Sequence, residues 1–206
     1  MHKKYFELDR FISAWECDLF IDYWQRNADR LISKNQGQEE LVDDFYGRAL
    51  RLKRVDNPLI HHYMNVIRVR TSLQIKEKFN LSFNEFVMPT NTQIVKWNTG
   101  QKMDLHTDTS RFTDGFNSAA YERGVGLKTP YHYRYSALIY LNDEYTGGET
   151  LMEGDVITPE KGKLVIFDSD NLHGVNEVKD VERFTMPMWF TNLPDWYEIG
   201  ASYNGE

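Results

Sequence analysis

Residues 133–142, YRYSALIYLN, decide the fold of this chain. The alternation of polar and apolar side chains is blurred from Ala137 to Leu141, as expected for a β-strand that is buried on both faces. Asn142 and the pair Gly147-Gly148 that follows it indicate a hairpin connection. We therefore interpret this stretch as a central strand of a β-sheet.

Six further β-type runs lie on either side of this strand and are separated by turn residues. They are FNEFVM (83–88), TQIVKW (92–97), MDLHTD (103–108), GETLME (148–153), GKLVIFD (162–168) and RFTMPMWF (183–190). Seven or eight short strands are typical of a sandwich or a barrel. From about residue 81 onward, we therefore expect a mainly β core.

The first eighty residues have helical patterns instead. Ser13 and Glu16 have the spacing of a capping box. A second helical segment is predicted at residues 39–54, and Asn57-Pro58 supplies an N-cap and a first-turn proline for a third helix that runs into the seventies. The first helix is predicted from apolar side chains that recur every four residues, at Phe11, Trp15, Leu19 and Tyr23. We expect one α+β domain over residues 1–206, with a helical support region at 1–80 and a β-rich core at 81–206.

Composition excludes several classes of protein. With 206 residues, of which 41% are hydrophobic and 27% charged, the chain can bury a core as one compact domain. A net charge of -7 argues against nucleic-acid binding through phosphate neutralisation. No apolar run has the length of a membrane span, and Cys17 has no second cysteine with which to form a disulfide. We expect a soluble, cytoplasmic protein with no membrane or nucleic-acid partner; the oligomeric state is left open.

A candidate metal site begins with His106 and Asp108. Side chains two residues apart on a strand point to the same face, so these two are expected side by side. His173 follows the run 163–168 and a tight turn at 168–171, where a jelly roll would bring a late strand beside an early one. Two imidazoles and one carboxylate form the facial triad that leaves three positions open on Fe(II).

Arg183, ten residues after His173, opens the apolar strand 184–190. Burying an Arg in such a strand costs several kcal/mol unless its charge is paired, and its period-two neighbours are uncharged. We therefore expect its guanidinium group to meet a ligand carboxylate through two parallel hydrogen bonds. The alternative is an ion pair with a nearby acid such as Glu182 or Glu177.

Five motifs in combination resemble the prolyl 4-hydroxylase-type branch of the 2-oxoglutarate and Fe(II)-dependent dioxygenases. They are HTD (106–108), YSALIYLND (135–143), GGET (147–150), GKLVIFDSDNLHGV (162–175) and RFTMPMWF (183–190). The resemblance covers roughly residues 90–191. It implies a double-stranded β-helix, that is, a cupin-like jelly roll, supported by N-terminal helices.

The resemblance also implies roles for single residues. His106, Asp108 and His173 would be the iron ligands, and Arg183 would bind the far carboxylate of 2-oxoglutarate. Tyr140 falls in the YLN motif, where family members place a phenol against that same carboxylate.

One position departs from the family pattern. Many members have a tyrosine nine residues before the first ligand histidine, and this chain has Trp97 there. Indole has no phenolic oxygen, although its nitrogen can donate a hydrogen bond. Trp97 is therefore expected to form part of the wall of the cofactor pocket.

The reaction implied by the resemblance is a hydroxylation. Fe(II), 2-oxoglutarate and O₂ would convert an unactivated C–H group to C–OH with release of succinate and CO₂, and ascorbate is a candidate reductant. The substrate would be a peptidyl or free amino acid or another small molecule, and the resemblance favours proline over other amino acids. The loop at 109–133 is a candidate lid, and aromatic candidates for the pocket wall are Tyr121, Tyr131, Tyr133, Trp97 and Trp189.

Two other functions stay open at this point. A jelly-roll protein could bind a metal without turnover, although such a protein has no use for a dicarboxylate pocket at Arg183 and Tyr140. A zinc hydrolase could use His106, Asp108 and His173, but the sequence has no H-E-x-x-H motif or comparable arrangement.

Overall fold

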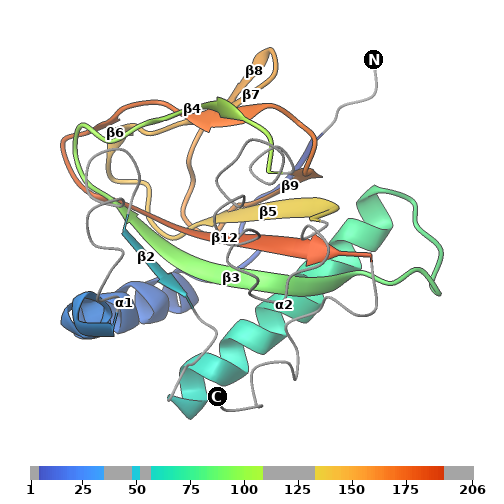
Figure 1. Cartoon of the computed structure of the whole chain (residues 1–206), viewed down its shortest axis with the longest axis horizontal. Helices are drawn as coiled ribbons and strands as arrows, with labels where there is room; N and C mark the ends of the chain where they lie inside the picture. Colours follow the sequence, from blue (N-terminus) through green and yellow to red (C-terminus); the bar gives the residue numbers. More distant parts are fainter. Residues whose placement is uncertain (1–4, 35–47, 52–56, 109–132, 193–206) are drawn as a thin grey trace, which may run out of the picture.

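The computed structural model describes residues 5–34, 48–51, 57–108 and 133–192. Two antiparallel sheets face each other, and helices α1 (Ala14–Lys34) and α2 (Pro58–Lys78) lie on the outer side of the larger sheet (Figure 1). No helix in the described ranges has the length and apolar character needed to cross a membrane.

The larger sheet has six strands, all antiparallel to their neighbours. In spatial order these are β1 (Tyr5–Leu8), β9 (Leu164–Asp168), β5 (Tyr135–Tyr140), β12 (Arg183–Thr191), β3 (Met88–Trp97) and β2 (Arg48–Arg51). β12 lies between β5 and β3 and pairs with both. Thr185 lies opposite Tyr140 on one side, and Arg183 lies opposite Trp97 on the other.

The smaller sheet has four strands and lies across the interior from the larger one (Figure 1). Its order is β4 (Met103–His106), β10 (His173–Val175), β7 (Thr150–Met152) and β8 (Asp155–Ile157). A two-stranded ribbon of β6 (Thr146–Gly147) and β11 (Val178–Lys179) joins the sheets at one end.

Both helices begin at the caps that the sequence predicts. The Glu16 backbone N–H donates to Ser13 Oγ, and the Ser13 backbone N–H donates to the Glu16 carboxylate, which together form the capping box. The Asn57 side chain accepts from the first-turn amides of α2 at 3.0 and 3.3 Å. In the described part of α1 the fully buried residues are Cys17, Phe20 and Trp24, beside the predicted stripe, of which Leu19 and Tyr23 are partly buried against the same core. Trp15 is exposed, and its ring meets that of Tyr63 of α2 edge-on.

Two apolar layers cover the two faces of β5, as its blurred pattern predicts. Ala137 and Ile139 face the core shared with α1 and α2, whereas Leu138 and Tyr140 face the interior between the sheets. Of the six residues of β5, five are buried. The interior between the two sheets is therefore lined by every second residue of the central strands.

Three local predictions are wrong. Within the segment 39–54, which was expected to be helical, Arg48–Arg51 forms β2, because pairing with β3 outweighs its helical propensity, and the rest of the segment lies outside the described residues. Gly147-Gly148 does not close a hairpin from β5, since β5 pairs with β9 and β12 and the chain crosses here to the smaller sheet. The run 83–88 was expected to be a strand, but residues 83–85 form a turn, closed by the bond from the Glu85 N–H to the Ser82 carbonyl, and β3 begins only at Met88.

Candidate active site

Three ligand-type side chains meet at one end of the interior. His106, the last residue of β4, lies directly opposite His173, the first residue of β10. Asp108 comes two residues after His106 and is held to the turn after β9 by the bond from its backbone N–H to the Ser169 carbonyl, at 3.0 Å. Backbone pairing therefore brings together residues that are 67 positions apart in the sequence.

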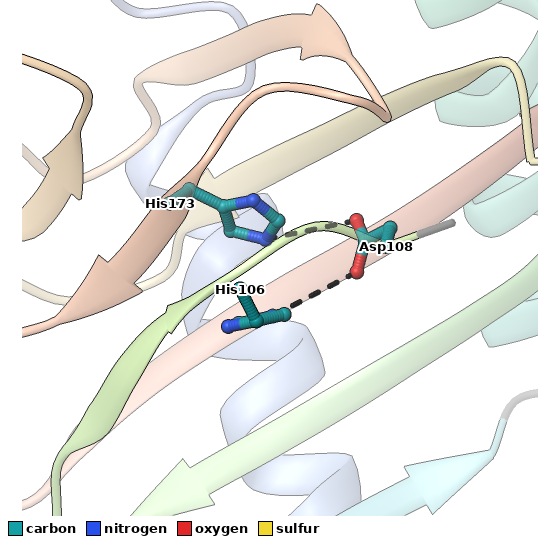
Figure 2. Close-up of side chains that lie close together, drawn as sticks. All are labelled: His106, Asp108 and His173. Atoms are coloured by element: carbon teal, nitrogen blue, oxygen red, sulfur yellow. Dashed lines mark ion pairs between the residues drawn. The ribbon is translucent and has the colours of Figure 1, made fainter. Parts of the chain in front are cut away.

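The potential ligand atoms of this triad converge (Figure 2). His106 Nε2 lies 3.9 Å from Asp108 Oδ1, and His173 Nε2 lies 3.7 Å from Asp108 Oδ2. All three ligand atoms lie within 4.8 Å of one another. The side chains are 17% (His106), 6% (Asp108) and 12% (His173) exposed, so all three are largely shielded from solvent.

Both imidazoles are oriented by their own backbone. His106 Nδ1 lies 2.9 Å from the Asp104 carbonyl oxygen, and His173 Nδ1 lies 2.9 Å from the Asn171 carbonyl oxygen. A carbonyl oxygen can only accept, so each Nδ1 carries the proton and donates it. Each Nε2 consequently presents its lone pair to the centre, which is the form that binds a metal.

Asp108 is held by two serines that the sequence reasoning missed. Ser136 Oγ donates to Asp108 Oδ2 at 2.5 Å, and it lies 2.8 Å from Ser169 Oγ. Because the Ser136 proton is committed to the carboxylate, Ser169 is the donor in the second bond. All three side chains are buried. The chain of hydroxyls fixes the rotamer of Asp108 and leaves Oδ1 turned toward His106.

Arg183 occupies the other end of the interior and is 1% exposed. Its guanidinium carbon lies 5.4 Å from the centre of the Trp97 ring and 5.5 Å from that of Tyr140. The guanidinium donates to Thr150 Oγ1 at 3.3 Å, and Tyr140 OH donates to the same oxygen at 2.5 Å. Burial raises the pKa of the Tyr140 phenol, and the positive charge of Arg183 opposes that rise, so the phenol stays protonated at neutral pH.

The alternative of an ion pair between Arg183 and Glu182 is wrong, because Glu182 pairs with Lys96. Within the described residues, no carboxylate forms an ion pair with Arg183. Its Nε has no hydrogen-bond partner, and neither does Trp97 Nε1 on the adjacent strand. The Arg183 end of the interior thus carries a buried positive charge and unused donors, which is a complement for an anion.

Trp189 lies on the same face of the larger sheet as Ser136, the residue that hydrogen-bonds Asp108. It is directly opposite Ser136 in the pairing of β12 with β5, and directly opposed residues share a face. Its ring is partly exposed and stacks on that of Tyr133, with centroids 5.7 Å apart and an interplanar angle of 29°. These two rings form an aromatic wall near the triad. Tyr121, Tyr131 and the rest of the predicted lid up to residue 132 lie outside the described residues.

Comparison with known proteins identifies this architecture. Residues 92–191 match the model of the 2OG-Fe(II) oxygenase superfamily. Prolyl 3-hydroxylase 2 of Rattus norvegicus is 38% identical over 74 residues, which are 32% of this chain and 10% of the relative. The chain thus aligns with about a tenth of the length of the curated relatives it matches.

Two solved structures share the fold along most of both chains. The viral collagen prolyl hydroxylase of Paramecium bursaria Chlorella virus-1, in its 2OG complex, has a TM-score of 0.63 at 20% identity and covers 93% of this chain and 97% of its own. A Pseudomonas putida prolyl-4-hydroxylase has a TM-score of 0.64 at 18% identity, with coverage of 93% and 94%. The predicted double-stranded β-helix with N-terminal helices is confirmed.

Proposed function

This chain belongs to the 2OG-Fe(II) oxygenase superfamily, and on that premise we propose that it hydroxylates a prolyl side chain in a peptide or in the free amino acid. The net reaction joins substrate, 2-oxoglutarate and O₂ to form the hydroxylated product, succinate and CO₂. The observation that carries the proposal is that one interior has a two-histidine, one-carboxylate centre at one end and an unpaired, buried Arg183 at the other.

The triad fits Fe(II). His106, Asp108 and His173 supply two neutral nitrogens and one carboxylate oxygen, a ligand set that leaves three of six positions open. Bound there, Fe(II) supplies the oxidising chemistry with O₂ and the co-substrate. The protein contributes orientation, because backbone carbonyls fix both imidazoles and Ser136 fixes the carboxylate.

Arg183 fits the far carboxylate of 2-oxoglutarate. A keto acid that chelates the metal through its 2-oxo end projects its second carboxylate away from the metal, and the planar guanidinium matches a carboxylate through paired bonds. Tyr140 and Thr150 place two hydroxyls beside that charge. Trp97 lies at this same end, opposite Arg183. Its indole ring therefore forms part of the wall of the pocket around Arg183, and its N–H is available there as a donor.

The aromatic wall supports proline as the substrate class. Trp189 and Tyr133 present stacked rings on the side of the interior that bears the metal ligands, and such faces suit the C–H groups of a compact, uncharged ring. The curated relatives and both solved structures described above are named as prolyl hydroxylases. The same names favour a prolyl residue in a peptide over free proline as the substrate. Ascorbate is proposed as the reductant that keeps iron in the Fe(II) state.

A screen for succinate release tests the proposal. Full-length protein with Fe(II), 2-oxoglutarate and ascorbate is offered proline-containing peptides, free proline and other free amino acids, and the product is located by mass spectrometry. The expected result is succinate release that depends on a prolyl substrate, with a mass gain of one oxygen atom. His106→Ala serves as the inactive control.

The outcome also separates the remaining functions. Succinate release with another amino acid and none with proline would contradict the substrate class and leave the oxygenase activity standing. A protein that binds metal and 2-oxoglutarate without releasing succinate from any substrate would favour the metal-binding jelly roll that does not turn over.

A further inference from the structure

Tyr145 carries an unused donor in the interior. It lies in the crossing from β5 to β6 and is 6% exposed, yet among the described residues its hydroxyl proton has no acceptor, because the neighbouring Arg183 guanidinium, whose hydrogen bonding lowers the pKa of the phenol, can only donate. Other buried tyrosines of this interior are satisfied: Tyr140 donates to Thr150, and Tyr5 donates to Asp155 at 3.0 Å. A buried hydroxyl left without a partner is costly, so its retention calls for an explanation.

The Tyr145 ring packs beside the Arg183 side chain. Gly148 separates the two: a Cβ atom at that glycine would lie 3.0 Å from Arg183 Cδ and 3.0 Å from Tyr145 Cε2. Gly148 also has a φ of +62°, in the left-handed region that favours glycine. The chain therefore crosses between the sheets without a side chain here, and this brings the phenol up to the guanidinium group.

The Tyr145 phenol is a donor at neutral pH. Burial raises its pKa well above the ordinary value, and the charge of Arg183 reduces that rise only in part. Arg183 itself offers donors alone, and one of them, Nε, is also unpaired. Two adjacent groups with unused donors and a positive charge can both be satisfied by one anion that sits between them.

We propose that the hydroxyl of Tyr145 binds the distal carboxylate of 2-oxoglutarate, together with Arg183. This inference rests on the proposed function, because it takes 2-oxoglutarate as the occupant of the Arg183 pocket. It adds a binding residue from the segment DEYTGGET (143–150), where the motif comparison assigned no ligand. The two hydroxyls near the guanidinium, those of Tyr140 and Tyr145, would then select for a ligand that is long enough to carry a carboxylate to this depth.

The test is a binding experiment that involves no turnover. Full-length protein is loaded with Mn(II) under nitrogen, and its affinities for 2-oxoglutarate and for pyruvate are measured by isothermal titration calorimetry. Pyruvate has the same 2-oxo acid end and lacks the distal carboxylate. The variants are Tyr145→Phe, which removes only the hydroxyl, Arg183→Ala, and Tyr5→Phe as a matched control for loss of a buried phenol that has a protein partner.

Tyr145→Phe should weaken 2-oxoglutarate binding about tenfold, as expected for loss of a hydrogen bond to a charged group. Its affinity for pyruvate should stay unchanged. The melting temperature of the metal-free variant should stay close to that of the wild type, because the Tyr145 hydroxyl has no acceptor to lose there. Tyr5→Phe should show the opposite pattern, with a lower melting temperature and unchanged affinity for 2-oxoglutarate.

Three results would overturn the inference. If Tyr145→Phe binds 2-oxoglutarate like the wild type while Arg183→Ala does not, Tyr145 is a packing residue and the proposed function survives. If the variant loses affinity for 2-oxoglutarate and pyruvate equally, the hydroxyl does not act on the distal carboxylate. If the Mn(II)-loaded wild type binds no 2-oxoglutarate, the proposed function fails together with this inference.

Discussion

At the triad, the two imidazoles are partly exposed, and their ring nitrogens that turn away from the centre are bonded to backbone carbonyls. At the Arg183 end the side chains are buried, and among the described residues Arg183 Nε, Trp97 Nε1 and the Tyr145 hydroxyl have no acceptor. The first end is complete except for its ion. The second holds a desolvated charge whose partner is absent from the described residues.

Because of this difference, the two ends should respond differently to the loss of a single side chain. A metal centre with three protein ligands fails when any one of them is lost, because the remaining two do not hold the ion in place. A pocket in which several donors share one carboxylate loses affinity in steps, because each donor contributes part of the binding free energy. The variants below test whether the two ends behave in these two ways.

The largest effect is expected at the triad. His106→Ala, Asp108→Ala or His173→Ala should each abolish Fe(II) retention and succinate release, while the circular dichroism spectrum stays that of the wild type. The ligands lie at strand ends rather than in the apolar layers, so the fold does not depend on them. His62→Ala, on the exposed surface of α2, is the matched control. Turnover at the wild-type level in any triad variant would show that the metal lies elsewhere.

Arg183→Ala should raise the 2-oxoglutarate concentration needed for half-maximal turnover by well over tenfold. A charge-assisted contact in a closed pocket is worth about 1.5 to 3 kcal/mol, which corresponds to a factor of roughly 10 to 150. Arg183→Lys should restore part of the affinity, since it keeps the charge and loses the paired geometry. An unchanged titration curve for the alanine variant would make Arg183 a structural residue.

Ser136→Ala tests whether the metal end is held by the serine pair. Loss of the bond to Asp108 Oδ2 should weaken metal binding by about tenfold, the lower end of what such supporting residues contribute. Affinity for 2-oxoglutarate at saturating metal should change little. Ser72→Ala, a buried serine of α2 whose hydroxyl has no partner, is the control. Equal metal affinities for wild type and Ser136→Ala, measured by competition with a chelator, would remove Ser136 from the site.

The smallest effect is expected at Trp97. Trp97→Phe keeps an aromatic ring under the guanidinium and loses the indole N–H, so 2-oxoglutarate binding should weaken about two- to fivefold, with metal binding unchanged. The measurement is the same calorimetric titration with Mn(II). A larger loss for metal than for 2-oxoglutarate would place Trp97 at the iron end and would contradict the position seen here.

The regular elements show where local sequence was sufficient. The caps at Ser13 and Asn57 were predicted because a cap depends on residues within one turn of each other. The residues Arg48–Arg51 were misassigned because their state depends on β3, more than 40 positions away. The centre of the buried face of α1 was missed for the same reason: Leu19 and Tyr23 are only partly buried, and packing against the rest of the fold makes Cys17, Phe20 and Trp24 the most buried residues.

The sequence by itself determined the ligand set of the metal end. The spacing of His106 and Asp108 predicted two neighbouring ligands, and His173 completed two imidazoles and one carboxylate. In the structure β4 ends at His106, so the backbone bond of Asp108 to Ser169, and not the face of a strand, places the carboxylate. Only the tertiary structure decided how these groups are supported. The Ser136 bond to Asp108 spans 28 positions, and the contact of Tyr145 with Arg183 depends on a crossing between sheets that was expected to be a hairpin. Residues two positions apart stay close in any backbone conformation, whereas hydrogen-bond partners across an interior are set by which strands pair, and that is a property of the whole fold.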